Sequence, residues 1–99
     1  MRTRAEGATL TVNGLNEVTS TNASELDDTI TGKTTPKIRT IDIDLSAATF
    51  LDNTGLRVLI NVHQRASREN RRVRLIKPTM NVMEILAFTE QDRTFELVF

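Results

Sequence analysis

The chain is 99 residues long, which suits one small domain with a single hydrophobic core. Its 13 basic and 13 acidic residues cancel, so no overall electric field favours capture of nucleic acid or of a membrane surface. The absence of cysteine excludes disulfides and thiolate catalysis, and no apolar run approaches the roughly 20 residues that span a bilayer. We therefore expect one soluble, cytoplasmic domain over residues 1–99, without membrane insertion, that contacts specific proteins.

The first predicted elements are a strand and a helix. Polar and apolar residues alternate from 8 to 13, which predicts a strand. Leu26 and Ile30 lie four residues apart, which predicts a short helix over 22–30. We expect Gly32 to end this helix, because glycine is a common residue at helix ends.

The next strand, predicted over 37–45, has a polar and an apolar side. Ile41 and Ile43 alternate with Asp42 and Asp44, a period of two. We expect both carboxylates to face solvent or a loop. A pair of carboxylates is an incomplete ligand set, and no second cluster of His, Asp or Glu accompanies it, so no metal site is predicted.

Four further elements complete the predicted order. Apolar residues spaced by three and four predict helices over 53–69 and 79–89, and apolar runs predict strands over 71–77 and 95–99. Strands and helices then alternate, which favours an α/β fold with a mixed sheet of about four strands and helices packed on it. The four phenylalanines are expected in the core rather than in a platform for stacking nucleic-acid bases.

The most informative segment joins the strand that ends at Leu45 to the following helix. Asp52 or Asn53 is the predicted N-cap, and Thr54 places a hydroxyl in the first turn, close to unpaired backbone N–H groups. Gly55 has no side chain, which we expect to let a partner approach closely. Similar residues occur at the start of any well-capped helix. Local physics alone therefore leaves open that these residues have a purely structural role.

A longer pattern surrounds this helix start. Asp44-Leu45-Ser46 is followed by Phe50-Leu51-Asp52-Asn53-Thr54-Gly55-Leu56-Arg57-Val58-Leu59. Together these segments resemble the signature of the STAS domain of bacterial anti-sigma factor antagonists. In that family the hydroxyl residue before the glycine is phosphorylated, and it corresponds to Thr54. The resemblance further implies that the partner-binding or site-shaping residues are Asp44, Asp52, Asn53, Gly55 and Leu56.

The resemblance implies a function in regulating sigma-factor-dependent transcription. An unmodified antagonist binds an anti-sigma factor that is also a serine/threonine kinase, which frees the sigma factor; phosphorylation reverses this, and a phosphatase is expected to restore binding. ATP would belong to the kinase, so we expect this chain to have no cofactor and no enzyme activity. Asp52 is assigned chiefly to helix capping, with a role in orienting the Thr54 hydroxyl, and Asp44 to shaping the loop.

The chain departs from the family pattern at several positions. Asn16 or Glu17 stands where an acid is common, Asn53-Thr54 replaces a pair of serines, and Asn70 and Glu90 replace glycines. The phosphate acceptor would therefore be a threonine. The turn at Glu90 is expected to be built differently from the turn in the family.

Other functions are weighed against this one. Small STAS subunits also regulate the ATPase of bacterial ABC-type phospholipid transporters. A ligand-binding or minor enzymatic α/β domain would need a pocket of convergent polar groups, which the sequence does not indicate. His63 falls on the apolar side of its helix and is interpreted as packed, and the arginines over 65–74 as solvated charges rather than a nucleic-acid site. Gly32-Lys33-Thr34 lacks the upstream glycine of a phosphate-binding loop.

Overall fold

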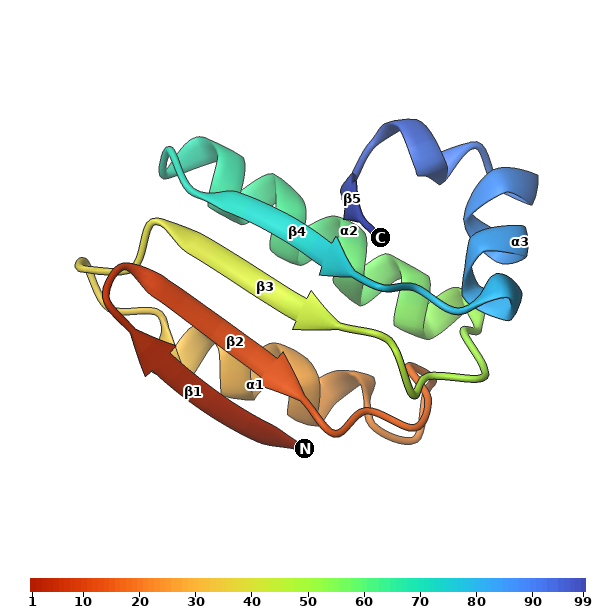
Figure 1. The fold of residues 1–99 in the computed structure, drawn as a ribbon, viewed down its shortest axis with the longest axis horizontal. Coiled ribbons are helices and arrows are strands. Elements are labelled where there is room, and N and C mark those ends of the chain that lie inside the picture. The colour runs from red at the N-terminus through yellow and green to blue at the C-terminus, as the bar shows by residue number, and fades with distance from the viewer.

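The computed structural model describes residues 1–99 and contains five strands and three helices (Figure 1). In chain order these are β1 (Arg2–Glu6), β2 (Thr9–Asn13), α1 (Ala23–Lys33), β3 (Thr40–Asp44), α2 (Asn53–Arg68), β4 (Arg72–Ile76), α3 (Met80–Phe88) and β5 (Glu96–Val98), with a 3₁₀ turn at Gln91–Arg93. The predicted single α/β domain is confirmed. None of the helices combines the length and the hydrophobicity required to cross a lipid bilayer.

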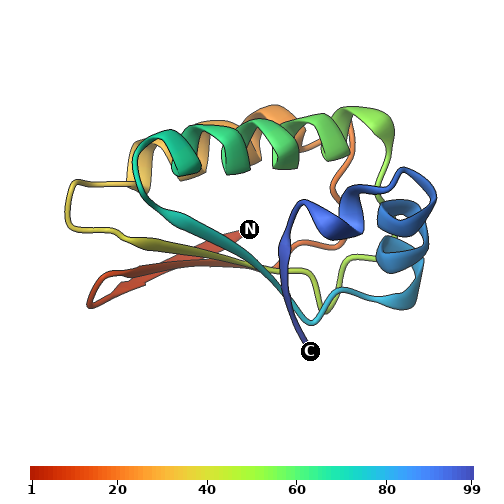
Figure 2. The ribbon, with the colours of Figure 1, turned by 90° about the horizontal axis from the view of Figure 1, so that it is seen from above.

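The five strands form one mixed sheet in the order β1-β2-β3-β4-β5. β1 is antiparallel to β2, and all other neighbours are parallel. Crossovers between parallel strands are right-handed, so a sheet that grows in one direction receives its helices on one face. Figure 2 shows α1 and α2 side by side over that face, with α3 at one end and the opposite face uncovered.

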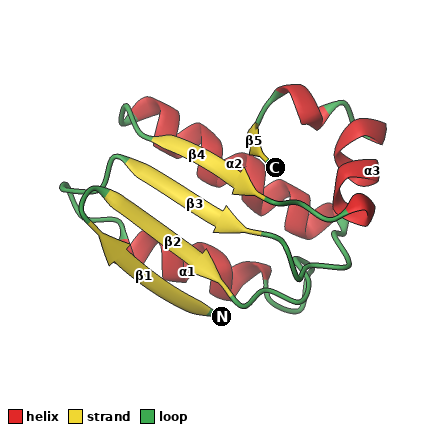
Figure 3. Ribbon diagram, in the orientation of Figure 1, coloured by secondary structure: helices red, strands yellow, loops and turns green.

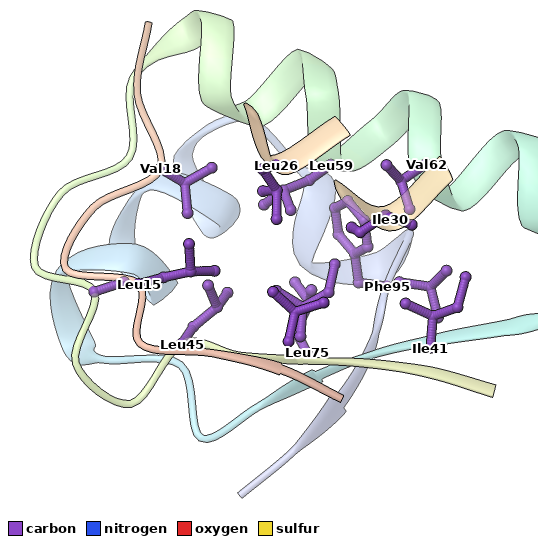
Figure 4. Close-up of a cluster of buried hydrophobic side chains, with 14 of the residues drawn as sticks. Leu15, Val18, Leu26, Ile30, Ile41, Leu45, Leu59, Val62, Leu75 and Phe95 are labelled. Carbon is purple, nitrogen blue, oxygen red and sulfur yellow. The ribbon is translucent and has the colours of Figure 1, made fainter. Parts of the chain in front are cut away.

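The hydrophobic core lies between this face of the sheet and the two long helices. Leu10 from β2, Ile43 from β3, Leu26 from α1 and Leu59 from α2 are each at most 1% exposed. Figure 4 shows Leu26 and Leu59 lying opposite Leu45 and Leu75 of the sheet side. Burial of each such side chain contributes about 1.5–3 kcal/mol, so this layer holds α2 firmly against the sheet.

β1 is the strand that the sequence did not predict. It forms a hairpin with β2 through Gly7, whose φ of 60° requires a left-handed conformation that glycine adopts easily. Most of β1 is exposed, and its sequence, Arg-Thr-Arg-Ala-Glu, has no apolar alternation. The strand forms because β2 has a free edge with unpaired backbone groups. Hydrophobic periodicity in the sequence does not indicate such an edge.

α1 ends later than expected, and the residues after α2 and α3 include two with a positive φ. α1 runs through Gly32 to Lys33, so the prediction that Gly32 ends this helix is wrong; it stops where the Thr34 N–H and hydroxyl both donate to the Ile30 carbonyl. Asn70 and Glu90, which stand where the family has glycines, have φ values of 60° and 61°. The turn at Glu90 therefore has the left-handed conformation that glycine favours.

Only one phenylalanine lies in the core. Phe95 is 6% exposed and packs edge to face on His63, with ring centroids 5.5 Å apart, so the packed histidine is confirmed. Phe50, Phe88 and Phe99 are 60%, 89% and 78% exposed, and the prediction of a core position is wrong for these three. The core space beneath α3 is filled by its smaller aliphatic side chains, which leaves Phe88 at the helix end pointing outward.

The polar side of β3 does face away from the helices, but Asp42 is not solvated there. It is 8% exposed, because Arg74 of β4 covers it and donates from Nε and Nη2 to its two carboxylate oxygens, each at 2.8 Å. This bidentate pairing raises the pKa of Arg74. The prediction of a solvent-facing Asp42 is therefore wrong, and the uncovered sheet face carries an organised ion pair.

Candidate functional site

Two loops meet where the parallel strands end (Figure 3): the loop from β2 to α1 and the loop from β3 to α2. Three backbone hydrogen bonds join them. The Val18 N–H donates to the Phe50 carbonyl at 2.9 Å, the Asp52 N–H to the Val18 carbonyl at 3.2 Å, and the Thr49 N–H to the Asn16 carbonyl at 3.0 Å. The first turn of α2 is thus anchored to a second segment of the chain, far away in sequence.

Asp52 is the N-cap of α2, which resolves the choice between Asp52 and Asn53. Its Oδ1 accepts the Gly55 N–H at 2.8 Å and its Oδ2 accepts the Ser20 N–H at 2.9 Å. These N–H groups, Gly55 first, hold the pKa of the Asp52 carboxyl below its ordinary value of 3.8. One carboxylate therefore both caps the helix and fastens the loop before α1 to it. No hydrogen bond joins Asp52 to the Thr54 hydroxyl. No contact therefore supports the expected role of Asp52 in orienting that hydroxyl.

Gly55 is required by the packing of the chain itself. A Cβ built on Gly55 would lie 1.9 Å from the Val18 carbonyl oxygen and 2.4 Å from its carbonyl carbon, far inside contact distance. The space beside this glycine is therefore filled by Val18, and the expectation that it is left open for a partner is wrong. The glycine allows the two loops to close on each other.

The remaining predicted site residues divide into exposed and supporting groups. Asn53 and Thr54 are exposed on the first turn of α2, and the Thr54 hydroxyl has no hydrogen-bond partner within the chain. Leu56 is 7% exposed and belongs to the core, so it supports the turn from beneath. Asp44, at the end of β3, accepts the Ser46 N–H at 2.9 Å and so shapes the start of the loop.

α3 borders the site on the other side of the same loop. The Thr79 hydroxyl donates to the Ala48 carbonyl at 2.6 Å, and the Asn81 amide donates to the Thr49 carbonyl at 3.1 Å. A shallow depression of about 280 Å³ lies between Phe50 of the loop and Ile85 of α3. Figures 1 and 2 place α3 and the start of α2 at the same end of the molecule.

The sequence did not indicate Val18, Ser20 or Phe50 as parts of the site. Val18 and Ser20 act through main-chain atoms, which leave no residue signature. Phe50 resembles any core residue in the sequence, and only its exposure distinguishes it.

The arrangement presents a free hydroxyl on a rigid main chain. It lies at a helix N-terminus, where partial positive charge favours added anions. No three His, Cys, Asp or Glu side chains converge anywhere in residues 1–99 in a way that could hold a metal ion. The site thus offers an exposed hydroxyl in the first turn of a helix.

Comparison with known proteins gives consistent results for the fold. The family model of the STAS domain matches residues 2–99. The crystal structure of TM1081, a candidate anti-sigma factor antagonist from Thermotoga maritima, superposes with a TM-score of 0.86 at 18% identity over 99% of this chain and 85% of that one. The anti-sigma factor antagonist SpoIIAA in its unphosphorylated form gives 0.77 at 13% identity, over 99% and 86%.

A much larger protein contains a similar domain. The murine anion transporter Slc26a9, in its inward-facing state, matches with a TM-score of 0.74 at 14% identity over 86% of this chain but only 14% of its own length. No protein of curated function matches the sequence significantly. At these identities the solved structures share the fold, and residue roles must be argued from the geometry of this chain.

Proposed function

The chain belongs to the STAS domain family, and from this premise we propose that it is an anti-sigma factor antagonist switched off by phosphorylation of Thr54. In the unmodified state it binds an anti-sigma factor with serine/threonine kinase activity, and the sigma factor is released. A phosphatase restores the unmodified state. The chain itself supplies a binding surface and a phosphate acceptor rather than catalysis.

The observation that carries the proposal is the setting of Thr54. Its side chain is exposed and free of internal hydrogen bonds, while the turn beneath it is fixed by Asp52 and by the close contact of Gly55 with Val18. A kinase can therefore reach the hydroxyl without unfolding the helix. Because Asp52 already accepts the nearby Gly55 and Ser20 N–H groups, a phosphate on Thr54 would project outward instead of replacing the cap.

Exposed apolar residues at this end of the molecule supply a surface for a partner. Phe50 precedes α2 in the loop, and Met80 lies at the start of α3, whose N-terminal turn is bonded to that same loop. These side chains are 60% and 77% exposed. Exposed apolar side chains bordered by polar residues are typical of interaction sites.

The switch follows from charge. A phosphate adds about −1.5 to −2 charges at neutral pH, next to a carboxylate that is already present. A partner that packs on Phe50 would have to desolvate this charge or meet it with acidic surface, and either weakens binding. A change of about 3 kcal/mol would lower affinity more than a hundredfold, which is enough for an on–off response.

The test compares Thr54→Ala and Thr54→Glu as baits for proteins in a lysate of the native cell. We expect the alanine form to retain an ATP-binding kinase and the glutamate form to lose it. Ser67→Glu, which adds the same charge at the exposed far end of α2, is the matched control and should bind like the unmodified protein. The captured kinase, given ATP, should phosphorylate the parent chain but not Thr54→Ala, as measured by mass spectrometry.

Two results would overturn the proposal. Phosphorylation of Thr54→Ala by the captured kinase would move the acceptor elsewhere. Equal retention of an ABC-type ATPase by both Thr54 variants would instead assign the chain to a transport complex.

A further inference from the structure

A second concave site lies at the opposite end of α2 from Thr54. It is a pocket of about 590 Å³ between the C-terminal ends of α1 and α2 and the connector that leads to β3. Thr54 and Arg68 are 14 residues apart, so about 21 Å of helix separates the two sites at 1.5 Å per residue. This volume falls within the range of about 300–1,000 Å³ that small-molecule sites occupy.

The floor of this pocket is apolar. Ile30 of α1, Ile41 of β3, and Val62 and Ala66 of α2 line it, and each is 2–3% exposed. The same four side chains belong to the hydrophobic core, so the pocket lies directly over the core, which exposes only small apolar areas to it. An apolar group placed there would gain contact with a preformed surface, without unfolding any segment.

The rim of the pocket is basic, although the whole chain is neutral. Its lining contains three arginines and one acidic residue, Glu69. Two of the three rim arginines have partners: Arg65 pairs with Asp27, and Arg71 pairs with Glu69. Arg68 has no ion-pair partner and is exposed. The rim therefore keeps one positive charge without an ion-pair partner, that of Arg68.

Carbonyl groups at a helix C-terminus carry partial negative charge. Two of those near the pocket are hydrogen-bonded within the chain: the Ile30 carbonyl accepts from Thr34, and the Ala66 carbonyl accepts the Arg71 N–H at 2.8 Å. The Arg71 side chain is likewise used internally, since its Nε donates to the Ile38 carbonyl at 2.7 Å. Arg68 is then the cation that remains available to a ligand.

From this combination we infer that the pocket between the C-terminal ends of α1 and α2 binds a small amphiphilic anion, an apolar body that carries one sulfonate, carboxylate or phosphate group. The apolar body lies on Ile30, Ile41 and Val62, and the acidic group pairs with Arg68. The site is independent of phosphorylation at Thr54, because it lies at the other end of the helix.

The experiment is a titration of the ¹⁵N- and methyl-labelled protein with naphthalenesulfonate, followed by NMR. Uncharged naphthalenemethanol and inorganic phosphate are titrated separately. We expect saturable shifts in the methyl groups of Ile30, Ile41 and Val62 with naphthalenesulfonate, and much weaker binding of the other two probes, since each supplies only half of the recognition.

Three variants assign the site. Arg68→Glu should weaken naphthalenesulfonate binding roughly tenfold or more, the value of one charge-assisted hydrogen bond. Arg57→Glu makes the same change on an exposed residue near the other end of α2 and should bind like the parent chain. Thr31→Trp places a ring over the pocket without changing its charge and should also abolish the methyl shifts.

Each contrary result would overturn the inference. Phosphate binding as tightly as naphthalenesulfonate would exclude a role for the apolar floor. Naphthalenemethanol binding equally well would exclude a role for Arg68. Shifts centred on Phe50 or Phe88 would show that the probe prefers the exposed aromatic side chains instead.

Discussion

The two ends of α2 differ in how the space around them is filled. At the N-terminal end, Asp52 binds two backbone N–H groups and Gly55 touches the Val18 carbonyl, so no room is left between the helix and the neighbouring loop. At the C-terminal end, Arg71 holds the connector at a distance through its long side chain, and a pocket of about 590 Å³ remains. One end presents a side chain on a fixed base, and the other presents a cavity.

If both proposals hold, one helix serves two kinds of recognition. A modified hydroxyl needs a main chain that stays in place when charge is added, and short contacts between backbone atoms provide that rigidity. A small ligand needs preformed space, which arises where long side chains, rather than backbone, bridge the gap.

The largest effect is expected from Gly55→Ala. The new methyl group would lie 1.9 Å from the Val18 carbonyl oxygen, so the loop before α1 must move away or the helix must shift. We expect a loss of more than about 4 kcal/mol in the free energy of unfolding, an exceptional value for one methyl group. Urea unfolding followed by circular dichroism measures it.

Gly32→Ala is the matched control at the pocket end. Gly32 lies inside α1, and nothing stands within 4 Å of a Cβ added there. Alanine should stabilise the protein by about 0.5–1 kcal/mol because it is the better helix former. If Gly55→Ala were as well tolerated as Gly32→Ala, the N-terminal end would not be tightly filled, and the contrast between the two ends would fail.

Arg71→Ala tests the pocket end. The side chain is 8% exposed and donates to the carbonyls of Ile38 and Thr35, at 2.7 and 3.2 Å. Removing it should cost about 1–3 kcal/mol, because the carbonyl of the buried Ile38 loses its donor. Amide hydrogen exchange should rise in the connector over residues 34–39 and stay unchanged around Asp52.

Arg72→Ala is the control for that change. Arg72 is the next residue along, but it is 62% exposed on the uncovered sheet face, where it pairs with Glu96. The free energy of unfolding of the Arg72→Ala variant should stay close to that of the parent chain, because most surface ion pairs contribute little to stability. A similar loss in both variants would mean that Arg71 acts only through its charge.

The smallest effect is a dependence on pH at the Asp52 cap. The pKa of Asp52 is depressed in the folded chain, so its stabilising contribution is present above the ordinary value of 3.8 and is lost as the pH falls through the folded value. Asp52→Asn should therefore lower the Tm near neutral pH, and the difference from the parent chain should shrink as the solution is acidified below about pH 4.

Thr79→Ala supplies the comparison for this profile. Thr79 caps α3 with a hydroxyl that accepts the Val82 N–H and does not titrate. Its Tm deficit should stay constant over the same pH range. If the Tm deficit of Asp52→Asn were equally independent of pH, the negative charge of Asp52 would not contribute to the stabilisation by this cap.

Several residues of the site at the N-terminal end of α2 could be predicted from the sequence. Asp52, Thr54 and Gly55 were identified because capping and first-turn positions depend on residues close together in the chain. The reason for Gly55 was wrong, since the contact that demands it comes from Val18, 37 positions away by residue number. No local pattern carries the position of another segment's carbonyl group.

The sequence by itself determined the order of β2, α1, β3, α2, β4, α3 and β5, because hydrophobic periodicity and turn residues act over short distances. Tertiary structure decided the rest. It paired the polar β1 with a free sheet edge, covered Asp42 with Arg74, left Phe50 and Phe88 outside the core, and opened the pocket beneath Arg68. Each of these outcomes depends on which surface remains unoccupied after the helices pack, and that is a property of the assembled fold.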